Sequence, residues 1–384
     1  MSGGSWWMAA GRGDEGSGTD FTLGAEEEFQ IVDAETRDLR QNVERILAAA
    51  QDSLGDQVKS EFRPSMVETA TRVCSSLREL RSELTRLRGE LAAAAQREEC
   101  HIAAGGTHPF AEAEQQGITD KERYRAIAEE YQQLAYEQLT FGCHVHVAIS
   151  DRDLAVRTLD RTRPWHAVLR ALGSNSPFWQ GKDTAYDSYR TLLFDRWPVS
   201  GMPDPFGSEA RYDEVIEDLE ATETIPDPSF VEWDVRLSAH YETLEFRVMD
   251  ACMTVDDAIM VAGLARSLTR TCHVQAVRGE SPSQPRPELM SAARWRAARY
   301  GVEGNLIDLV GCRSVPATEL IERFLDYLRP DLLEHGEWDE LSQLVHRTLE
   351  RGTGARRQRE AMQRSGKLTA VVDLLVEQTM SGAS

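Results

Sequence analysis

Gly24-Ala25-Glu26-Glu27-Glu28-Phe29 is the stretch that decides how this 384-residue chain folds. It lies within Phe21–Val32, a segment that predicts a β-strand. Side chains on a strand alternate with a period of two, so Glu26 and Glu28 would share one face. Carboxylates that share a buried face carry a large desolvation cost unless cations neutralise them. The stretch therefore predicts a sheet with one chemically specialised face.

Three distant segments extend this pattern. Gly142-Cys143-His144-Val145-His146-Val147 would place both imidazoles on one strand face and turn Cys143 into the core. Thr243-Leu244-Glu245-Phe246-Arg247-Val248 would pair a carboxylate with a guanidinium in the same way. Glu61-Phe62-Arg63-Pro64-Ser65-Met66-Val67-Glu68 adds two more carboxylates. The candidate metal ligands in these segments are Glu26, Glu28, Glu61, Glu68, His144 and Glu245.

The order of the expected elements indicates an α+β fold, because a mixed sheet comes first and helices follow. Leucines at helical spacing predict a helix over 74–99, and residues 173–210 form a long loop region typical of a lid or binding loop. Other expected strands are two pieces in 58–69 broken by Pro64, then 101–104, 141–150, and a hairpin of 230–238 with 242–249. Other expected helices are 43–54, a helix from an Asp120 cap to Glu137, 151–172, 208–221, 255–278, 287–300, 316–328, 337–350, 355–365 and 367–379.

The amino-acid composition limits the kinds of molecule that this protein is expected to bind. The formal charge of -21 argues against nucleic acid or an anionic membrane as a partner, since both select for basic surface. The same charge can serve solubility alone, or it can mark an acidic site that holds cations. Six scattered cysteines without a CxxC pair indicate reduced thiols rather than structural zinc. With 41% hydrophobic residues, the chain has enough apolar side chains for a substantial core.

The sequence predicts no targeting signal and a single domain after a short tail. Trp6-Trp7-Met8 is too short for the apolar core of a signal peptide, and the sequence has no bilayer-length apolar run. We therefore expect a cytoplasmic protein. Residues 1–19 are rich in Gly and Ser, which predicts a disordered tail, and 20–384 are expected to form one catalytic domain.

Carboxylates and imidazole around Mg²⁺ or Mn²⁺ make chemical sense, because these hard cations prefer oxygen ligands and tolerate histidine. Six candidate ligands exceed the need of one ion, so two or three ions bridged by nucleotide phosphates would fit. Arg247 would lie beside the phosphates and offset their charge. Arg236 and Arg190 could bind a substrate carboxylate in a bidentate manner. His146 and Lys182 complete the set of candidate nucleotide contacts.

Each of these residues has a plainer alternative. A single glutamate can belong to a solvated strand face, and His146 can be a hydrogen-bonded structural residue. Arg247 can form a simple ion pair with Glu245, and Arg236 and Arg190 can form surface salt bridges. The sequence has no Walker A motif, no GxGxxG after a strand and no GxSxG, so it supports neither a P-loop, a Rossmann site nor a serine nucleophile elbow.

Several motifs in the right order resemble those of the type 2 glutamate–cysteine ligases, also called carboxylate–amine ligases. The resemblance spans roughly residues 20–380. It is carried by the segments 24–29, 64–71 (Pro-Ser-Met-Val-Glu-Thr-Ala-Thr), 103–110 (Ala-Ala-Gly-Gly-Thr-His-Pro-Phe), 142–147, 175–179 (Asn-Ser-Pro-Phe-Trp), 243–248, 293–299 (Ala-Arg-Trp-Arg-Ala-Ala-Arg) and 352–355 (Gly-Thr-Gly-Ala).

The resemblance implies a glutamine-synthetase-like core, with helices covering an antiparallel sheet whose concave face holds ATP and two or three Mg²⁺ ions. The family's metal ligands fall here on the same six residues, Glu26, Glu28, Glu61, Glu68, His144 and Glu245, with Arg247 beside them. Two departures are alanines where the family usually has glycine, at Ala148 and Ala185. An added methyl matters where the backbone needs a positive φ or approaches a ligand closely.

The implied reaction is ATP-dependent amide formation through an acyl phosphate, with the 175–190 loop excluding water. The substrates would be a small carboxylate and an amine. The family name indicates glutamate and cysteine as this pair. A metal-dependent hydrolase and a nucleotide-binding protein without turnover remain the alternatives. The helical C-terminal third could supply a homo-oligomer interface.

Overall fold

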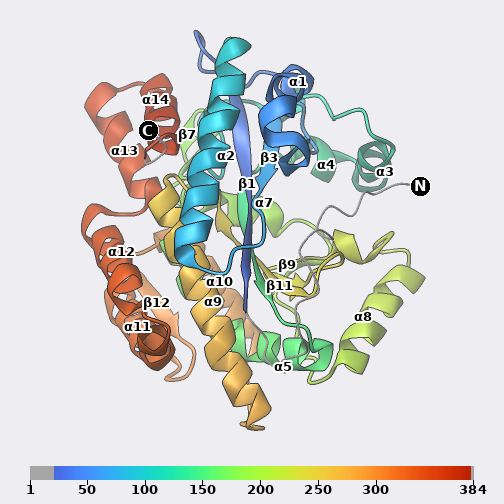
Figure 1. Cartoon of the computed structure of the whole chain (residues 1–384), viewed down its shortest axis with the longest axis vertical. Helices are drawn as coiled ribbons and strands as arrows, with labels where there is room; N and C mark the ends of the chain where they lie inside the picture. Colours follow the sequence, from blue (N-terminus) through green and yellow to red (C-terminus); the bar gives the residue numbers. More distant parts are fainter. Residues whose placement is uncertain (1–20, 382–384) are drawn as a thin grey trace.

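The computed structural model describes residues 21–381, and the expected tail lies outside this range (Figure 1). Its centre is a seven-stranded sheet in the order β10-β11-β5-β1-β3-β2, with β4 paired to the end of β1. Every ladder of this sheet is antiparallel. The strands are β1 (Leu23–Asp33), β2 (Val58–Ser60), β3 (Met66–Ala70), β4 (Cys100–Ala103), β5 (Gly142–Ala148), β10 (Val235–Leu237) and β11 (Thr243–Asp250).

Helices surround this sheet and make up most of the C-terminal third (Figure 1). Three short strand pairs lie outside the sheet: β6 (Phe178–Trp179) with β7 (Lys182–Asp183), β8 (Ser200–Gly201) with β9 (Glu232–Trp233), and β12 (Asn305–Asp308) with β13 (Arg313–Pro316). The helices are α1 (Val43–Leu54), α2 (Leu77–Arg97), α3 (Glu122–Tyr131), α4 (Gln133–Glu137), α5 (Arg152–Thr162), α6 (His166–Leu172), α7 (Tyr189–Phe194), α8 (Glu209–Ala221), α9 (Val255–Val277), α10 (Pro287–Tyr300), α11 (Ala317–Glu334), α12 (Trp338–Arg351), α13 (Gly354–Ser365) and α14 (Leu368–Thr379).

One face of the sheet is the hydrophobic core. Helices α2 and α9 pack across it, and Figure 1 shows both running in front of β1. Alternate side chains of β5 and β11 point into this layer, among them Cys143, Val145 and Phe246, all of which are fully buried. The alternation that places these residues in the core leaves the histidines and Glu245 on the other face. The prediction that Cys143 faces the core is confirmed.

Most expected elements are present, and the differences have local causes. The helix expected from Asp120 to Glu137 begins after Lys121 and breaks at Gln132, whose φ is +47°. Asp120 is not its cap, because its carboxylate pairs with Arg125 instead. The helix expected to end at 328 continues through Pro330, since Leu332 is buried against the core.

Two strand assignments also change. Residues 305–316 form the β12–β13 hairpin where no element was expected, and the Asp308 carboxylate accepts the backbone N–H groups of Val310 and Gly311 in its turn. The strand expected over 230–238 is divided: β9 pairs in parallel with β8, and β10 alone pairs with β11.

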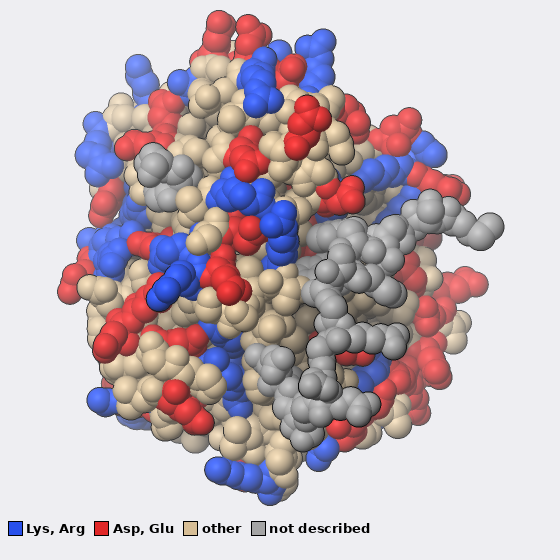
Figure 2. All heavy atoms as spheres, viewed as in Figure 1, with Lys and Arg blue, Asp and Glu red and all other residues tan. Residues whose placement is uncertain are grey.

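Charged side chains of both signs are interspersed on the face shown in Figure 2. Among residues 21–381, no helix combines the length and the apolar character that a membrane span requires.

Candidate functional site

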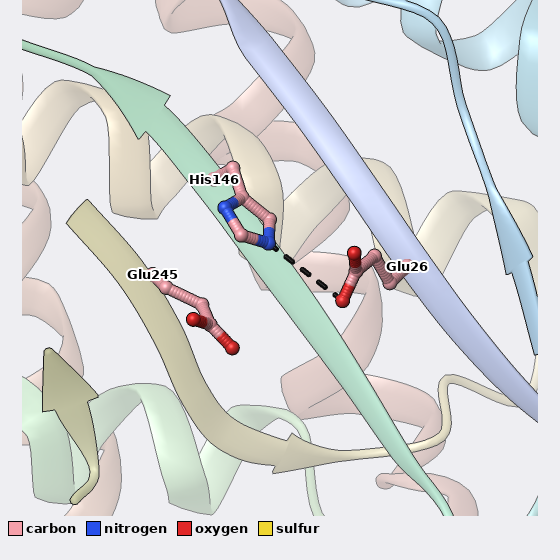
Figure 3. A group of neighbouring side chains, drawn as sticks. All are labelled: Glu26, His146 and Glu245. Carbon is pink, nitrogen blue, oxygen red and sulfur yellow. Dashed lines mark ion pairs between the residues drawn. The ribbon is translucent and has the colours of Figure 1, made fainter. Parts of the chain in front are cut away.

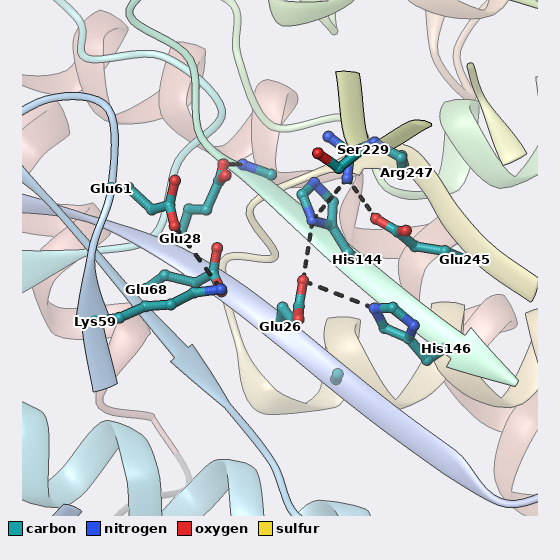
Figure 4. A network of polar contacts seen from close by, with 12 residues as sticks. Glu26, Glu28, Lys59, Glu61, Glu68, His144, His146, Ser229, Glu245 and Arg247 are labelled. Carbon is teal, nitrogen blue, oxygen red and sulfur yellow. Dashed lines mark hydrogen bonds and ion pairs between the residues drawn. The ribbon is translucent and has the colours of Figure 1, made fainter. Parts of the chain in front are cut away.

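A cavity of about 360 Å³ opens on the face of the sheet opposite α2 and α9. Its floor carries all six candidate metal ligands together with His146 and Arg247 (Figure 4). Arg236 also lines the cavity. Its walls come from the β2–β3 turn, from α3 and from the segments around Ser229 and Tyr241. Residues up to 221 positions apart in the sequence thus share one concave surface, from Glu26 to Arg247.

The antiparallel register produces this convergence. Glu26 lies opposite His144, and Glu28 lies opposite Glu68. On the other side of β5, His146 lies opposite Glu245. Directly opposed side chains on one face have their Cβ atoms about 4.5–5.5 Å apart, so neighbouring strands place these groups in contact.

The first of two groups on the cavity floor, here the histidine group, consists of Glu26, His146 and Glu245 (Figure 3). One ligand atom from each of them lies within 4.8 Å of the others. Nδ1 of His146 contacts the Thr243 hydroxyl at 2.9 Å, which fixes the ring and leaves Nε2 at 3.7 Å from the Glu26 carboxylate. This Nε2 is buried and has no hydrogen-bond partner among the described residues. His146 is therefore held through Nδ1, while its Nε2 lies toward the Glu26 carboxylate.

His144 lies beside this group. Its Nδ1 is 3.5 Å from the Glu26 carboxylate and 3.4 Å from Nη1 of Arg247. Burial and then the Arg247 charge lower the pKa of His144 to about 4, so the ring is neutral and able to donate a lone pair. Its Nε2 is also buried without a partner among the described residues.

The second group, here the lysine group, consists of Glu28, Glu61 and Glu68 with the Lys59 ammonium (Figure 4). Nζ of Lys59 is 2.8 Å from Glu68 and 3.9 Å from Glu61. The Tyr124 hydroxyl donates to Glu61 at 3.1 Å. Burial raises the pKa of all three carboxyls, and their mutual repulsion adds to it for Glu61 and Glu68, although Lys59 opposes the rise in both. Crowded carboxylates of this kind favour added positive charge.

Electrostatics differ in the histidine group. Burial alone would raise the pKa of Glu26, but the imidazoles of His144 and His146, 3.5 and 3.7 Å from its carboxylate, outweigh it and hold the pKa well below the usual value. For Glu245, Arg236 and Arg247 likewise outweigh the effect of burial and lower the pKa. Both carboxylates are therefore ionised near neutral pH.

The candidate arginines have different surroundings. Arg236 donates from Nε and Nη2 to Glu245 at 2.8 and 3.1 Å, and from Nη1 to the carbonyls of Ser229 and Val231. These bonds occupy its guanidinium, so Arg236 holds Glu245 in place. Arg247 contacts Glu245 and also Glu232 at 2.9 Å, and it faces the cavity.

Two other candidates do not line the cavity. Arg190 is buried behind it, where Gly142 makes room: a Cβ on Gly142 would lie 2.5 Å from Nη2 of Arg190. Lys182 is exposed on β7, outside the cavity, because the β6–β7 hairpin points it toward solvent.

The 175–190 segment is anchored rather than poised over the site. The Asp250 carboxylate accepts bonds from the backbone N–H of Asn175 and from the hydroxyls of Ser176 and Ser188, at 2.7–2.8 Å. Gly106 permits this packing, because a Cβ there would lie 2.6 Å from Cγ of Asp250. The residues after this segment, such as Phe194 and Trp197, line the cavity instead. The expectation that 175–190 closes over the site is therefore not supported by its placement.

Sequence reasoning missed several residues of the site. Lys59 alternates with Glu61, which was a usable signal, but the strand there is only three residues long. Arg63 is fully buried and donates to the carbonyls of Gln116, Ala135, Tyr136 and Gln138, so it fixes the wall that carries Tyr124. Nothing in the sequence predicts those distant acceptors.

The donor set fits Mg²⁺ or Mn²⁺. It combines carboxylate oxygens with two imidazole nitrogens that have no hydrogen-bond partner within residues 21–381. These ions accept oxygen ligands with some histidine, whereas a zinc site is typically built from cysteine and histidine. All three residues of the histidine group, and the three carboxylates of the lysine group, are potential ligands.

Similar proteins place the fold and the sequence in context. A glutamate–cysteine ligase from Francisella tularensis, solved in complex with AMP, has a TM-score of 0.70 at 11% identity, covering 96% of this chain and 90% of that one. A bifunctional glutathione synthetase from Pasteurella multocida has a TM-score of 0.66 at 17% identity, with 94% of this chain matching 52% of that one. The antiparallel sheet with its helical cover is thus the fold of the glutamine-synthetase-like ligases.

The family follows from sequence. Residues 22–379 match the model of "Glutamate-cysteine ligase family 2". A Frankia alni protein named "Putative glutamate--cysteine ligase 2-2" is 43% identical over 377 residues, which cover 94% of this chain and 98% of that protein. The chain therefore belongs to the glutamate–cysteine ligase family 2.

Proposed function

We propose that this protein is an ATP-dependent carboxylate–amine ligase that forms an amide bond through an acyl phosphate. The observation that carries the proposal is the convergence of Glu26, Glu28, Glu68, His146 and Glu245 on one cavity floor with Arg247 beside them. Membership of a ligase family and the AMP in the Francisella structure support an adenine nucleotide as the ligand.

The carboxylates and imidazoles of the cavity floor would hold two or three Mg²⁺ ions, which Mn²⁺ could replace. When bound, the ions would supply positive charge to the β- and γ-phosphates of ATP. Glu26, His146 and Glu245 form the part of the floor with the tightest ligand geometry. Glu28, Glu61 and Glu68, with His144, supply the remaining donors.

Arg247 would contact the transferring phosphoryl group, because its guanidinium faces the cavity and is held by Glu245 and Glu232. Arg236 would act through Glu245 as a positioning residue. Arg190, buried behind Gly142 with Nη1 donating to the Arg247 carbonyl at 3.3 Å, would position the bulge that carries Arg247.

Activation of the carboxylate follows elementary chemistry. Transfer of the γ-phosphoryl group to a substrate carboxylate replaces a poor leaving group, oxide, with a good one, phosphate. An amine then attacks the acyl carbon, phosphate departs, and the amine loses a proton. Glutamate and cysteine are the substrates that the relatives' names give, and they are the first pair to test. A cytoplasmic location, where ATP and Mg²⁺ are available, belongs to this proposal.

One assay tests the proposal against its two alternatives. The protein is incubated with ATP, Mg²⁺ and a pool of amino acids that includes glutamate and cysteine, and ADP and new amides are followed by mass spectrometry. ADP release that depends on an amine supports the ligase. Release of phosphate or acid without an amine would instead indicate a metal-dependent hydrolase, and nucleotide binding without turnover a non-catalytic protein.

A matched pair of variants connects that assay to the site. Glu245→Gln should remove turnover, since it takes a ligand from the histidine group and the partner of Arg236 and Arg247. Glu242→Gln, three residues away and exposed, is the control and should keep full activity. Equal activity in the two variants would remove Glu245 from the proposed site.

A further inference from the structure

The two acidic groups on the cavity floor differ in one respect. The histidine group contains no lysine, and its carboxylates contact imidazole and guanidinium groups. The lysine group has an ammonium as a direct partner of two of its three carboxylates, Glu61 and Glu68. Figure 4 shows Lys59 reaching toward Glu68 and Glu61, apart from the histidines.

The backbone register fixes the position of this ammonium. Lys59 lies directly opposite Glu68 in the β2–β3 ladder, so its side chain starts on the cavity face beside that carboxylate. The Lys59 side chain is 46% exposed, whereas that of Glu68 is 5% exposed. The aliphatic stem therefore covers the edge of the sheet while the charged end reaches inward to the carboxylate.

A divalent ion held between Glu61 and Glu68 would compete for the carboxylate oxygens that Lys59 now contacts. It would also lie close to a positive charge in a partly buried site, where repulsion between like charges is stronger than in water. Either the ammonium or the ion can neutralise this pair, and both together are unfavourable.

We propose that Lys59 is a resident cation of the lysine group and takes the place of one divalent ion. Without nucleotide the protein then takes up a single divalent ion, in the histidine group. With nucleotide, two ions rather than three complete the site. The identity of the ion as Mg²⁺ or Mn²⁺ rests on the proposed function.

Counting bound Mn²⁺ tests this directly. Nucleotide-free protein is titrated with Mn²⁺, and the free ion is measured by electron paramagnetic resonance. The wild type should bind one tight Mn²⁺ per chain and Lys59→Met two, because removal of the ammonium frees Glu61 and Glu68. Lys59→Arg retains the charge and should bind one. A wild type that binds none or at least two, or a Lys59→Met variant that stays at one, overturns the proposal.

A second cavity lysine provides the matched control. Lys121 also lines the cavity, but its Nζ donates to the Ser60 carbonyl at 2.9 Å rather than to Glu68. Lys121→Met should therefore leave the count at one. Two tight ions in this variant would show that any loss of positive charge opens a site, which contradicts the specific role of Lys59.

Thermal unfolding gives an independent readout. In EDTA, Lys59→Met should unfold at a lower temperature than the wild type, and saturating Mn²⁺ should raise its unfolding temperature by a larger amount. Equal shifts in both proteins overturn the proposal even if the variant is less stable. Neither measurement uses nucleotide or amine, so failure of the ligase assay would leave these outcomes unchanged and the two proposals distinguishable.

Discussion

The two faces of β1 carry the same residue type with opposite consequences. Glu27 points into the core and is 1% exposed, and Arg88 of α2 forms an ion pair with it. Nε and Nη2 of Arg88 donate to Glu27 at 3.0 and 2.5 Å, and its other N–H groups reach the carbonyls of Cys252, Met253 and Thr379. All five N–H groups of Arg88 are therefore used, and each oxygen of Glu27 accepts one of them.

Glu26 and Glu28, on either side of Glu27 in sequence, point into the cavity. They face other carboxylates and two imidazoles with unclaimed Nε2 atoms among the described residues. Burial of charge is common to both faces, so burial does not identify the site. What distinguishes the two faces of β1 is that Glu27 is paired with one guanidinium, whereas Glu26 faces His144 and His146, whose Nε2 atoms have no hydrogen-bond partner among residues 21–381.

The largest expected effect comes from breaking the complete pair. Arg88→Met leaves Glu27 as an unpaired buried charge and should lower the free energy of unfolding by about 3–5 kcal/mol. Urea unfolding followed by circular dichroism measures it. Arg45→Met is the control, because Arg45 pairs with Glu98 at 3.6 Å with a side chain 73% exposed, and it should change stability by less than about 0.5 kcal/mol. Similar losses in both variants would contradict the comparison.

On the cavity face, we expect a substitution to reduce activity and to leave stability unchanged or higher. Glu28→Gln should reduce turnover at least about 100-fold, since it removes a proposed ligand. Its stability should stay equal or rise, because burial raises the pKa of Glu28 and repulsion from its acidic neighbours is relieved. The ligase assay and urea unfolding are run on the same preparation. A large loss of stability with intact turnover would make Glu28 a structural residue like Glu27.

The buried histidine His108 makes the stability of the protein depend on pH. His108 is fully buried like His144, but its ring is satisfied: Nδ1 accepts the Ala111 N–H at 2.9 Å, and Nε2 lies 3.0 Å from the Arg37 carbonyl. Burial lowers the pKa of His108 from 6.5 to about 4. The unfolded chain therefore protonates His108 below about pH 6.5, whereas the folded chain protonates it only below about pH 4. The folded state consequently loses stability as the pH falls from about 6.5 to about 4.

The expected contribution is about 1.4 kcal/mol per pH unit between these limits. Urea unfolding of the wild type and of His108→Gln at pH 7, 6 and 5 gives the two slopes. The variant is expected to be less stable at pH 7 and to have the smaller slope. Identical slopes would mean that His108 is accessible to protons in the folded protein.

The smallest expected effect concerns the two alanines where the family usually has glycine. Ala185 has a φ of +62°, a region that glycine adopts without steric cost. Ala185→Gly should therefore raise the free energy of unfolding by up to about 1 kcal/mol. Ala148→Gly, at the end of β5, should lower it by about 0.5–1 kcal/mol, since its φ is not positive. Differential scanning calorimetry separates these opposite signs, and equal signs would refute the backbone explanation.

Local pattern was sufficient for the sheet strands and most helices. The period-two alternation in 24–29, 142–147 and 243–248 predicted which side chains share a face, and leucine spacing predicted α2. The sequence did not predict short elements such as β8 and the β12–β13 hairpin, because they hold only two to four residues. The Arg190 and Lys182 assignments relied on residue type in a loop whose path the sequence did not define.

By itself the sequence determined that carboxylates and imidazoles alternate with apolar residues, because strand geometry is local. Only the tertiary structure decided which groups are complete and which are open, since completeness depends on register, on the bulge between Phe246 and Met249, and on side chains brought from elsewhere. Arg88 arrives from α2 to satisfy Glu27, and Lys59 arrives from β2 to meet Glu68. Long-range contacts set these pairings, and no local pattern of residues encodes them.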